Sequence, residues 1–215
     1  MSKPFRRLLY GLGALALLGI IAAGVLSTPW AQRAIQRRII TNLENLTGGH
    51  IQVYSFSFSP LLLQATFREF VMRGTESDST PALFSAKTMV VRLHPISLVR
   101  RRLLLRSLDW DNATIHVYSQ PDGSTNLPEP LTSLLPEIDS AEVQVERLAL
   151  VHTQFFWNDQ RTSLDLHAQN VAFLLRQEGP QKYAGSLSTS DLRIKSHDRP
   201  FPIIALATQF ELSAR

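Results

Sequence analysis

The sequence contains no cysteine, and this absence excludes several classes of site. Without thiols there is no disulfide scaffold, no thiolate-bound zinc and no cysteine nucleophile, and the redox compartment stays undetermined. The six histidines show no HExxH or other metal-ligand spacing. The chain also lacks a GxSxG elbow, a Walker loop and a Rossmann glycine pattern. We therefore expect no catalytic set, no cofactor and no metal site, and we predict that the protein is not an enzyme.

The 215-residue chain has one long segment without charged residues, and charge is unevenly spread over the rest. Before residue 49 there are six basic residues and one acid, a balance of +5. The remaining residues carry 16 basic and 17 acidic groups, a balance of −1. Because the excess positive charge is confined to the N-terminal part, we expect no basic face for nucleic acid.

The uncharged segment is "LLYGLGALALLGIIAAGVL", residues 8–26. As a helix it extends roughly 28 Å, close to the roughly 30 Å hydrocarbon core of a bilayer. We predict an uncleaved, single-pass anchor within residues 1–27; the alternative is a signal peptide, whose apolar region is usually only about 7 to 15 residues long. Three basic residues precede the segment and three follow it, so the positive-inside rule only weakly favours a cytoplasmic N-terminus.

Residues 28–48 are predicted to form a short amphipathic helix. Pro29 fits the first turn and Gly48 can end the helix. One face carries apolar side chains: Ile35, Ile39, Leu43 and Leu46. Another carries the candidate membrane-interface residues: Trp30, Arg33, Arg37 and Arg38. The helix either lies on anionic headgroups or plugs one end of the following domain, or it is an ordinary amphipathic helix packed on a sheet.

From residue 49 the apolar pattern changes to a period of two, which is typical of strands. We predict a first β-meander unit at residues 49–127, a proline-rich connector at 128–140, and a second β-meander unit at 141–215 that is cut short. The pairs "LLLRSLDWDN" and "ATIHVYSQ", and "AEVQVERLALVH" and "TQFFWND", are each predicted as two strands. A hairpin at Asn158 and Asp159 follows the last of these.

The predicted fold class is therefore mainly β, with an elongated, curved antiparallel sheet shaped as an open trough. "RLALVHTQFFWNDQ" also echoes "RSLDWDNATIHVYSQPDG", which indicates a weak internal repeat. Alternation places eight residues on one face of the sheet as candidates to line an apolar lipid groove. They are Leu63, Ala65, Phe67, Met89, Val91, Leu93, Ile115 and Val117.

Two acidic motifs are weighed as sites. In "SQPDGSTNLPEP" the residues Asp122, Gly123 and Asn126 resemble part of a calcium loop, but the position for a bidentate acid is Ser133 and the flanks are strands. We interpret the loop as a structural turn, since Asp-Gly is a strong turn dipeptide. Asp109 and Asp111 form a DxD pair without a surrounding nucleotide fold, and we expect no metal there.

These pieces, in this order, resemble the AsmA-like and TamB family of bacterial cell-envelope proteins. The resemblance depends on the N-terminal anchor, on "NLTGGHIQVYSFSFSPL" and on "LRSLDWDNATIHVYSQPDGSTNL". Asp122, Gly123 and Asn126 match the family's terminal DGxxN motif. The resemblance implies an N-terminal piece or a short relative of a longer repetitive sheet, anchored in the inner membrane with most of the chain in the periplasm.

The resemblance further implies phospholipid transport between the inner and outer membranes and a part in outer-membrane biogenesis. The expected partners are membrane phospholipids and an outer-membrane assembly protein. An alternative is a scaffold for outer-membrane protein assembly or secretion that binds proteins by β-strand addition, without lipid transfer.

Overall fold

The computed structural model describes residues 24–77, 79–98, 103–128, 143–179, 182–197 and 199–213. The predicted anchor lies outside these ranges except for residues 24–27, and the predicted connector except for residue 128. Within the described ranges, no helix combines the length and the apolar character needed to cross a membrane.

The N-terminal helix of the described chain is α2, Pro29–Thr47. Its first turn is capped by Thr28, whose hydroxyl accepts a hydrogen bond from the amide of Ala31. Its last turn ends at Gly48, which has a φ of 67° and donates its amide to the carbonyl of Glu44. Glycine adopts this left-handed conformation without a Cβ penalty, so it stops the helix where the sequence predicts.

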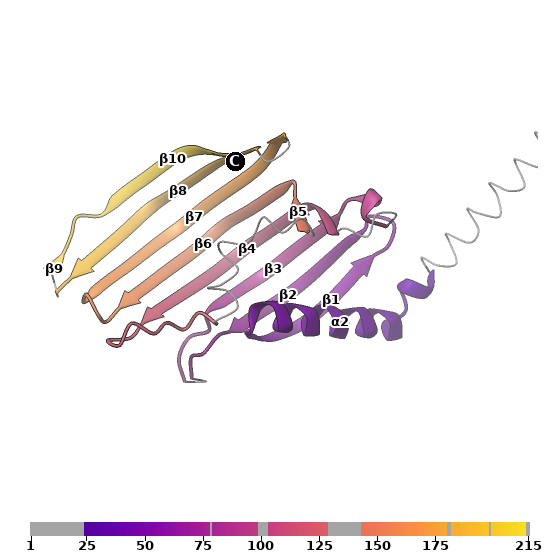
Figure 1. Ribbon diagram of the computed structural model, residues 1–215, viewed down its shortest axis with the longest axis horizontal. Helices are drawn as coiled ribbons and strands as arrows, with labels where there is room; N and C mark the ends of the chain where they lie inside the picture. Colours follow the sequence, from indigo (N-terminus) through magenta and orange to yellow (C-terminus); the bar gives the residue numbers. More distant parts are fainter. Residues whose placement is uncertain are drawn as a thin grey trace, which may run out of the picture.

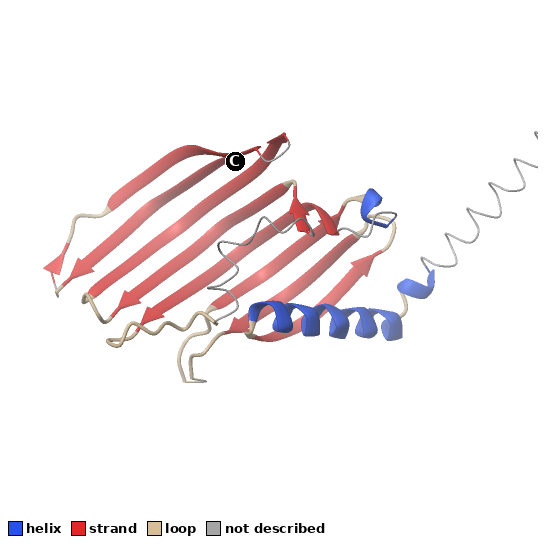
Figure 2. Cartoon of the chain, in the orientation of Figure 1, coloured by secondary structure: helices blue, strands red, loops and turns tan. Residues whose placement is uncertain are grey.

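The strands form one open, mixed sheet of ten strands in a single layer (Figures 1 and 2). The main path through the sheet is β1-β2-β3-β4-β6-β7-β8-β10, with β5 paired to β4 and β9 paired to β8. A short 3₁₀ helix, η1 (Pro95–Leu98), follows β3. The strands are β1 His50–Ser59, β2 Gln64–Arg73, β3 Phe84–Leu93, β4 Leu103–Ser119, β5 Val143–Val145, β6 Arg147–Asp159, β7 Leu164–Gly179, β8 Lys182–Ser196, β9 Arg199–Pro200 and β10 Ile204–Ser213.

The prediction of a purely antiparallel sheet is wrong at β4, which pairs in parallel with both β5 and β6. Every pair between β4 and β6 has the same offset, from Leu108–Leu148 to Ser119–Asp159. The two segments that echo each other in sequence are therefore in-register neighbours. A tight turn can join only antiparallel strands, whereas the long segment between Ser119 and Arg147 allows the chain to return to the starting end of β4.

The prediction of a break is also wrong for β4 and β6, which are continuous over 17 and 13 residues. The alternation of β4 breaks at Asn112, which has a φ of 49°. Comparable residues interrupt β2, β6 and β7: Glu69 (49°), His152 (50°) and Asn170 (51°). In the register, Asn112 lies opposite Lys87 and next to His152. We call the line formed by Glu69, Asn112, His152 and Asn170 the crease.

The crease shifts the side-chain alternation by one residue without ending the strands. In a regular strand Trp110 and Ala113 would face opposite sides, because their separation is odd. Instead both belong to the same apolar cluster, as do Phe67 and Phe70 on β2. A left-handed residue thus keeps the apolar side chains of a long strand on one face.

The best-packed part of the apolar cluster lies on β1 to β4. Phe67 is only 2% exposed and Ala113 only 1%. A chain of aromatic contacts crosses these four strands, with ring centroids separated by 5.0 Å (Phe56–Phe67), 6.3 Å (Phe67–Phe70), 5.8 Å (Phe70–Phe84) and 5.2 Å (Phe84–Trp110). Such tilted and edge-on pairs add to the stability gained from burial.

Helix α2 covers this part of the sheet and lies alongside β1 and β2 (Figure 1). Ile39, Ile40 and Leu43 pack against the apolar cluster. The helix is therefore packed on the sheet, as one of the alternatives predicted. We call the face of the sheet that α2 contacts the helix-side face.

The same helix also protects the edge of the sheet at β1. The side chain of Gln32 donates to the carbonyl of Phe58 and accepts from its amide, at 3.1 and 3.0 Å. Glu44 accepts from the amide of Ile51 at 2.9 Å. Side chains thus satisfy backbone groups that an edge strand leaves unpaired.

Candidate functional site

The helix-side face is apolar from one edge of the sheet to the other. Residues that are directly paired on adjacent strands share a face, so the register identifies its members. One row crosses all eight strands of the main path. It consists of Phe56, Phe67, Met89, Trp110, Leu150, Phe173, Leu187 and Thr208.

The large side chains of this face become more exposed toward β10, although Leu150, Thr153 and Ala168 on β6 and β7 are still buried. Phe67 and Met89 are buried, whereas Phe155, Phe173 and Leu187 are only half-buried. On β10 the apolar side chains of the face, Ile204, Leu206 and Leu212, are exposed. In the described part of the chain, α2 is the only α-helix on this face, and it reaches only the β1 end. The half-buried side chains of β6 to β10 therefore form an apolar surface that α2 does not cover.

The eight residues predicted to line a groove divide into two groups. Ala65, Phe67 and Met89 are buried, with Val91 and Ile115 packed against them. These five belong to the cluster beside α2, where protein side chains already fill the space. The other three lie toward strand ends: Leu63 in the turn before β2, Leu93 paired with Leu105, and Val117 paired with Trp157. The uncovered side chains on β6 to β10 were missed, because their exposure depends on how far α2 extends.

One glycine shapes the uncovered surface. The rings of Phe173 and Phe210 stack at 6.1 Å between centroids. A Cβ atom at Gly185 would lie 2.4 Å from the Phe210 ring. The absence of a side chain at Gly185 thus allows Phe210 to lie across β8, so the apolar surface continues to the edge strand.

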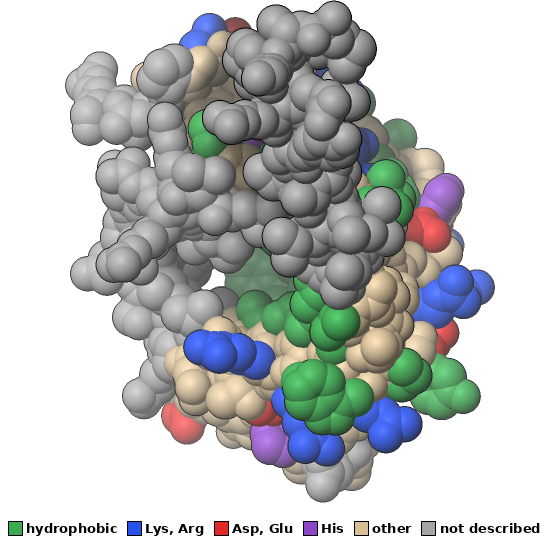
Figure 3. Space-filling view, turned by 90° about the vertical axis from the view of Figure 1, so that its right-hand side faces the viewer, with side chains coloured by type: hydrophobic (Ala, Val, Ile, Leu, Met, Phe, Trp, Pro, Cys, Tyr) green, Lys and Arg blue, Asp and Glu red, His purple; other side chains and the backbone are tan. Residues whose placement is uncertain are grey.

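The four predicted membrane-interface residues point away from the sheet. Trp30 is 77% exposed, and Arg33, Arg37 and Arg38 are also exposed. Lys and Arg side chains lie next to hydrophobic side chains at the end of the molecule that carries α2 and β1 (Figure 3). Aromatic and basic side chains are typical of the membrane–water interface. The packing of α2 on the sheet leaves these four side chains exposed.

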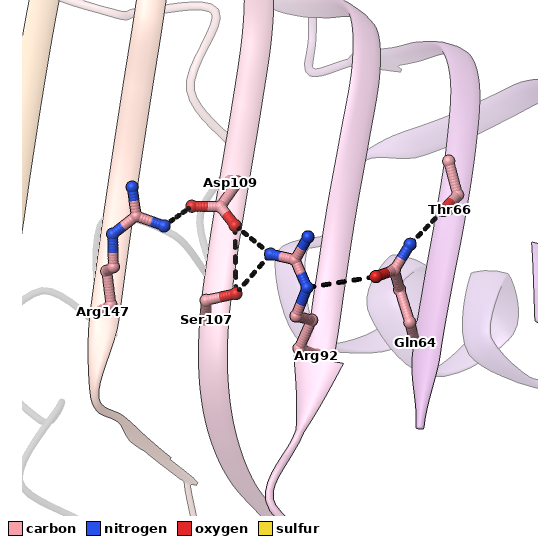
Figure 4. A network of polar contacts seen from close by, with 6 residues as sticks. All are labelled: Gln64, Thr66, Arg92, Ser107, Asp109 and Arg147. Carbon is pink, nitrogen blue, oxygen red and sulfur yellow. Dashed lines mark hydrogen bonds and ion pairs between the residues drawn. The ribbon is translucent and has the colours of Figure 1, made fainter. Parts of the chain in front are cut away.

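The face opposite to the helix-side face carries a polar network around Asp109 (Figure 4). Arg92 donates to one carboxylate oxygen at 2.7 Å and Arg147 to the other at 2.5 Å. Ser107 also donates to this carboxylate, and Gln64 accepts from Arg92. The network ties β2, β3, β4 and β6 together and lines a hollow of about 330 Å³.

The second acid of the DxD motif is paired separately. Asp111 lies 2.8 Å from Nδ1 of His152. This hydrogen bond lowers the pKa of the Asp111 carboxyl below its ordinary value. Both acids therefore have basic partners on neighbouring strands. In the described ranges, no group of three or more His, Asp and Glu side chains is arranged to hold a metal ion.

The loop at Asp122 closes the end of β4. Asp122 accepts hydrogen bonds from the amide and the hydroxyl of Ser124, and Gly123 has a φ of 87°. These bonds also lower the pKa of Asp122. Asn126 is only 5% exposed; its amide donates to the carbonyl of His116 and accepts from the amide of Tyr118, both at 2.8 Å. Asn126 thus bonds to β4 beyond the end of its pairing with β3.

We expect Asn126→Ala to lower the free energy of unfolding by about 2–3 kcal/mol. The backbone amide of Tyr118 and the backbone carbonyl of His116 would both lose their hydrogen-bond partner. Asp122→Ala is the matched control and should cost much less, since Asp122 is exposed and contacts only its own turn. Urea denaturation of both variants measures the difference. Equal losses, or calcium-dependent stability that disappears in Asp122→Ala, would show that the loop is more than a turn.

A comparison with known protein families and with characterised proteins finds no match to this chain.

Proposed function

We propose that this chain is an envelope protein that holds phospholipid acyl chains on the uncovered part of its helix-side face. In this proposal it takes part in phospholipid transport between the inner and outer membranes of a bacterium and in outer-membrane biogenesis. Residues 1–27 anchor it in the inner membrane, and most of the chain lies in the periplasm. The choice of the bacterial inner and outer membranes and of phospholipid is based on the resemblance to the AsmA-like and TamB family.

The observation that carries the proposal is the continuous apolar row, which α2, the helix that the structure describes on this face, covers only beside β1. An antiparallel or mixed sheet normally buries its apolar face against a second layer. Here the row continues through Leu150 on β6 and through the half-buried Phe173 and Leu187 on β7 and β8. A large apolar surface in water is an aggregation liability unless something occupies it, and acyl chains match its chemistry.

The dimensions of the sheet also suit a lipid. Eight strands about 4.8 Å apart give a row roughly 34 Å across, longer than one acyl chain. If the sheet curves into an open trough, this row becomes its floor. The exposed Trp30, Arg33, Arg37 and Arg38 of α2 then lie at the headgroups where lipid enters.

Photocrosslinking in cells tests the proposal. We expect a photoreactive residue at Phe155 or Phe173 to capture phospholipid, because both side chains lie on the helix-side face. Matched positions on the opposite face are Gln154 and Arg176, which should capture at least about tenfold less. A crosslinker at Phe67 should capture mainly protein, since its neighbours already enclose it. Equal lipid capture on both faces, or none on either from a folded protein, would contradict the proposal.

A second candidate function is a scaffold that binds proteins by strand addition, and the edge strand β10 favours it. Among the described strands it pairs with β8 alone, and nine of its ten residues are exposed. The edge at β1 is protected by Gln32 and Glu44 from a separate helix, whereas the side-chain bond described at a β10 carbonyl comes from the same strand, from Thr208 to Gln209 at 3.5 Å. Unpaired edges accept strands from other chains. Protein rather than lipid adducts from a crosslinker at Gln209 would support this alternative.

A further inference from the structure

A cleft of about 790 Å³ lies on the face opposite to the helix-side face, near the turn that joins β6 to β7. The register builds its floor as a row across four strands: His116, Phe156, His167 and Arg193 are directly paired in this order. The segment after β9 adds Phe201 and Ile203 to its wall. Small-molecule sites are typically clefts of about 300–1,000 Å³ with mostly apolar walls and a few polar groups, and this cleft has that character.

The floor of the cleft is a row of three rings. The centroids of His116 and Phe156 are 4.4 Å apart with the ring planes at 74°, and those of Phe156 and His167 are 4.1 Å apart with the rings nearly parallel. Phe156 and His167 face one another across strands and therefore present their edges to the cleft. Ring edges carry partial positive charge, so this pair favours an anion or another hydrogen-bond acceptor.

The two imidazoles have hydrogen-bonding capacity that no described residue uses. Both ring nitrogens of His116 and Nε2 of His167 are buried without a partner. Buried polar atoms in proteins are nearly always hydrogen-bonded, so these three nitrogens call for a partner such as water or a bound molecule. Burial lowers the pKa of both histidines. Each neutral ring therefore offers one donor and one acceptor.

The β8 side of the cleft carries two basic side chains. Arg193 and Lys195 both line it, and both are exposed. Asp191 binds two nitrogens of Arg193, at 2.9 and 2.7 Å, which leaves further guanidinium N–H groups for a ligand. The acid lining the cleft, Asp165, accepts a hydrogen bond from the side chain of Asn158.

The wall formed after β9 is apolar and exposed. Phe201 is 54% exposed and Ile203 is 62% exposed, and Phe201 is held by its amide hydrogen bond to the carbonyl of Ile194. Large exposed apolar side chains beside a cleft indicate a binding groove rather than a solvated surface.

We propose that this cleft binds an anionic amphiphile with a single acyl chain. The acyl chain lies against Phe156, Phe201 and Ile203. The carboxylate or phosphate group lies near Arg193, Lys195 and the imidazole edges. Such a molecule matches both the apolar wall and the two basic side chains. The site is on the other face of the sheet from the surface proposed to carry phospholipid, so either proposal can fail without the other.

Site-mapped photolabelling tests the cleft with the full chain held in amphipol and a photoreactive fatty acid as probe. We expect the label on Phe156, His167 and Phe201, located to single residues by fragmentation of the labelled peptides. Arg193→Gln and Phe201→Ser should each lower this labelling about tenfold, as loss of one charge-assisted contact or one apolar contact predicts. Both positions are exposed, so the variants should fold, and near-UV circular dichroism checks this. Arg176→Gln, an exposed arginine on β7 outside the cleft, is the control and should label as the unaltered chain does.

Competition identifies the charged group. Unlabelled oleate and 1-oleoyl lysophosphatidate should both displace the probe, and oleyl alcohol, which lacks the charge, should need about tenfold more. Stronger competition by oleate assigns the cleft to free fatty acids, and stronger competition by lysophosphatidate assigns it to phospholipid products. The proposal is overturned if oleyl alcohol competes as well as oleate, if the label is spread evenly over the chain, or if folded Arg193→Gln labels normally. Label on Phe155 and Phe173 themselves, without label on Phe156, His167 or Phe201, would support the lipid surface and reject the cleft.

Discussion

Phe67→Ala is expected to lower the free energy of unfolding by about 3–5 kcal/mol, the usual cost of removing a buried phenylalanine ring. Phe67 is 2% exposed and contacts both Phe56 and Phe70, so its loss leaves a cavity that three strands border. Chemical denaturation followed by tryptophan fluorescence measures the change, since Trp110 belongs to the same cluster.

Phe173→Ala is the matched control for this substitution. Phe173 is in the same row of the helix-side face but is only half-buried, and we expect a loss about half as large. Equal losses at the two positions would mean that the uncovered surface is packed as tightly as the cluster beside α2. That result would contradict the apolar surface on which the lipid proposal depends.

Insertion of one alanine directly after Asn112 is expected to prevent stable folding. The extra residue shifts the side-chain alternation once more, and the residues after the insertion move to the other face. Ile115 and Val117 would then leave the helix-side face, and His116 and Thr114 would enter it. Exposing two aliphatic side chains costs roughly 3–6 kcal/mol, comparable to the whole stability of many domains. Circular dichroism and thermal unfolding of the purified variant measure the outcome.

Asn112→Gly separates the backbone requirement from the side chain. Glycine adopts a φ of 49° without strain, so this variant should fold with nearly unchanged stability. Asn112→Val should be destabilised by about 1–2 kcal/mol, because a β-branched residue is strained in this conformation. An insertion variant as stable as the unaltered chain would show that the number of residues through the crease has no part in fixing the faces of the sheet.

Much of the local structure was predictable from the sequence. The ends of α2 follow from Pro29 and Gly48, since helix ends depend on the residues at the ends themselves. The turn at Asp122 and Gly123 was predictable for the same reason. Apolar alternation correctly indicated a mainly β protein and placed Ala65, Phe67 and Met89 in one cluster.

The site was less predictable, because it depends on long-range pairing. Period-two reasoning separates one strand into two at Asn112, since a break in alternation looks the same whether the chain turns or passes through a left-handed residue. The cleft on the opposite face was missed for a related reason: His116 and His167 are 51 positions apart and meet only through Phe156.

By itself, the sequence determined the features that short-range physics controls: the capped helix, the alternating strands, the turn at Gly123 and the apolar character of one strand face. Only the tertiary structure decided that β4 and β6 run parallel, that the strands continue through the crease, and how far α2 covers the helix-side face. These three properties arise from pairing between residues tens of positions apart, and backbone hydrogen bonds between strands carry no sequence label of their own. The uncovered apolar surface and the cleft on the opposite face are both consequences of that pairing.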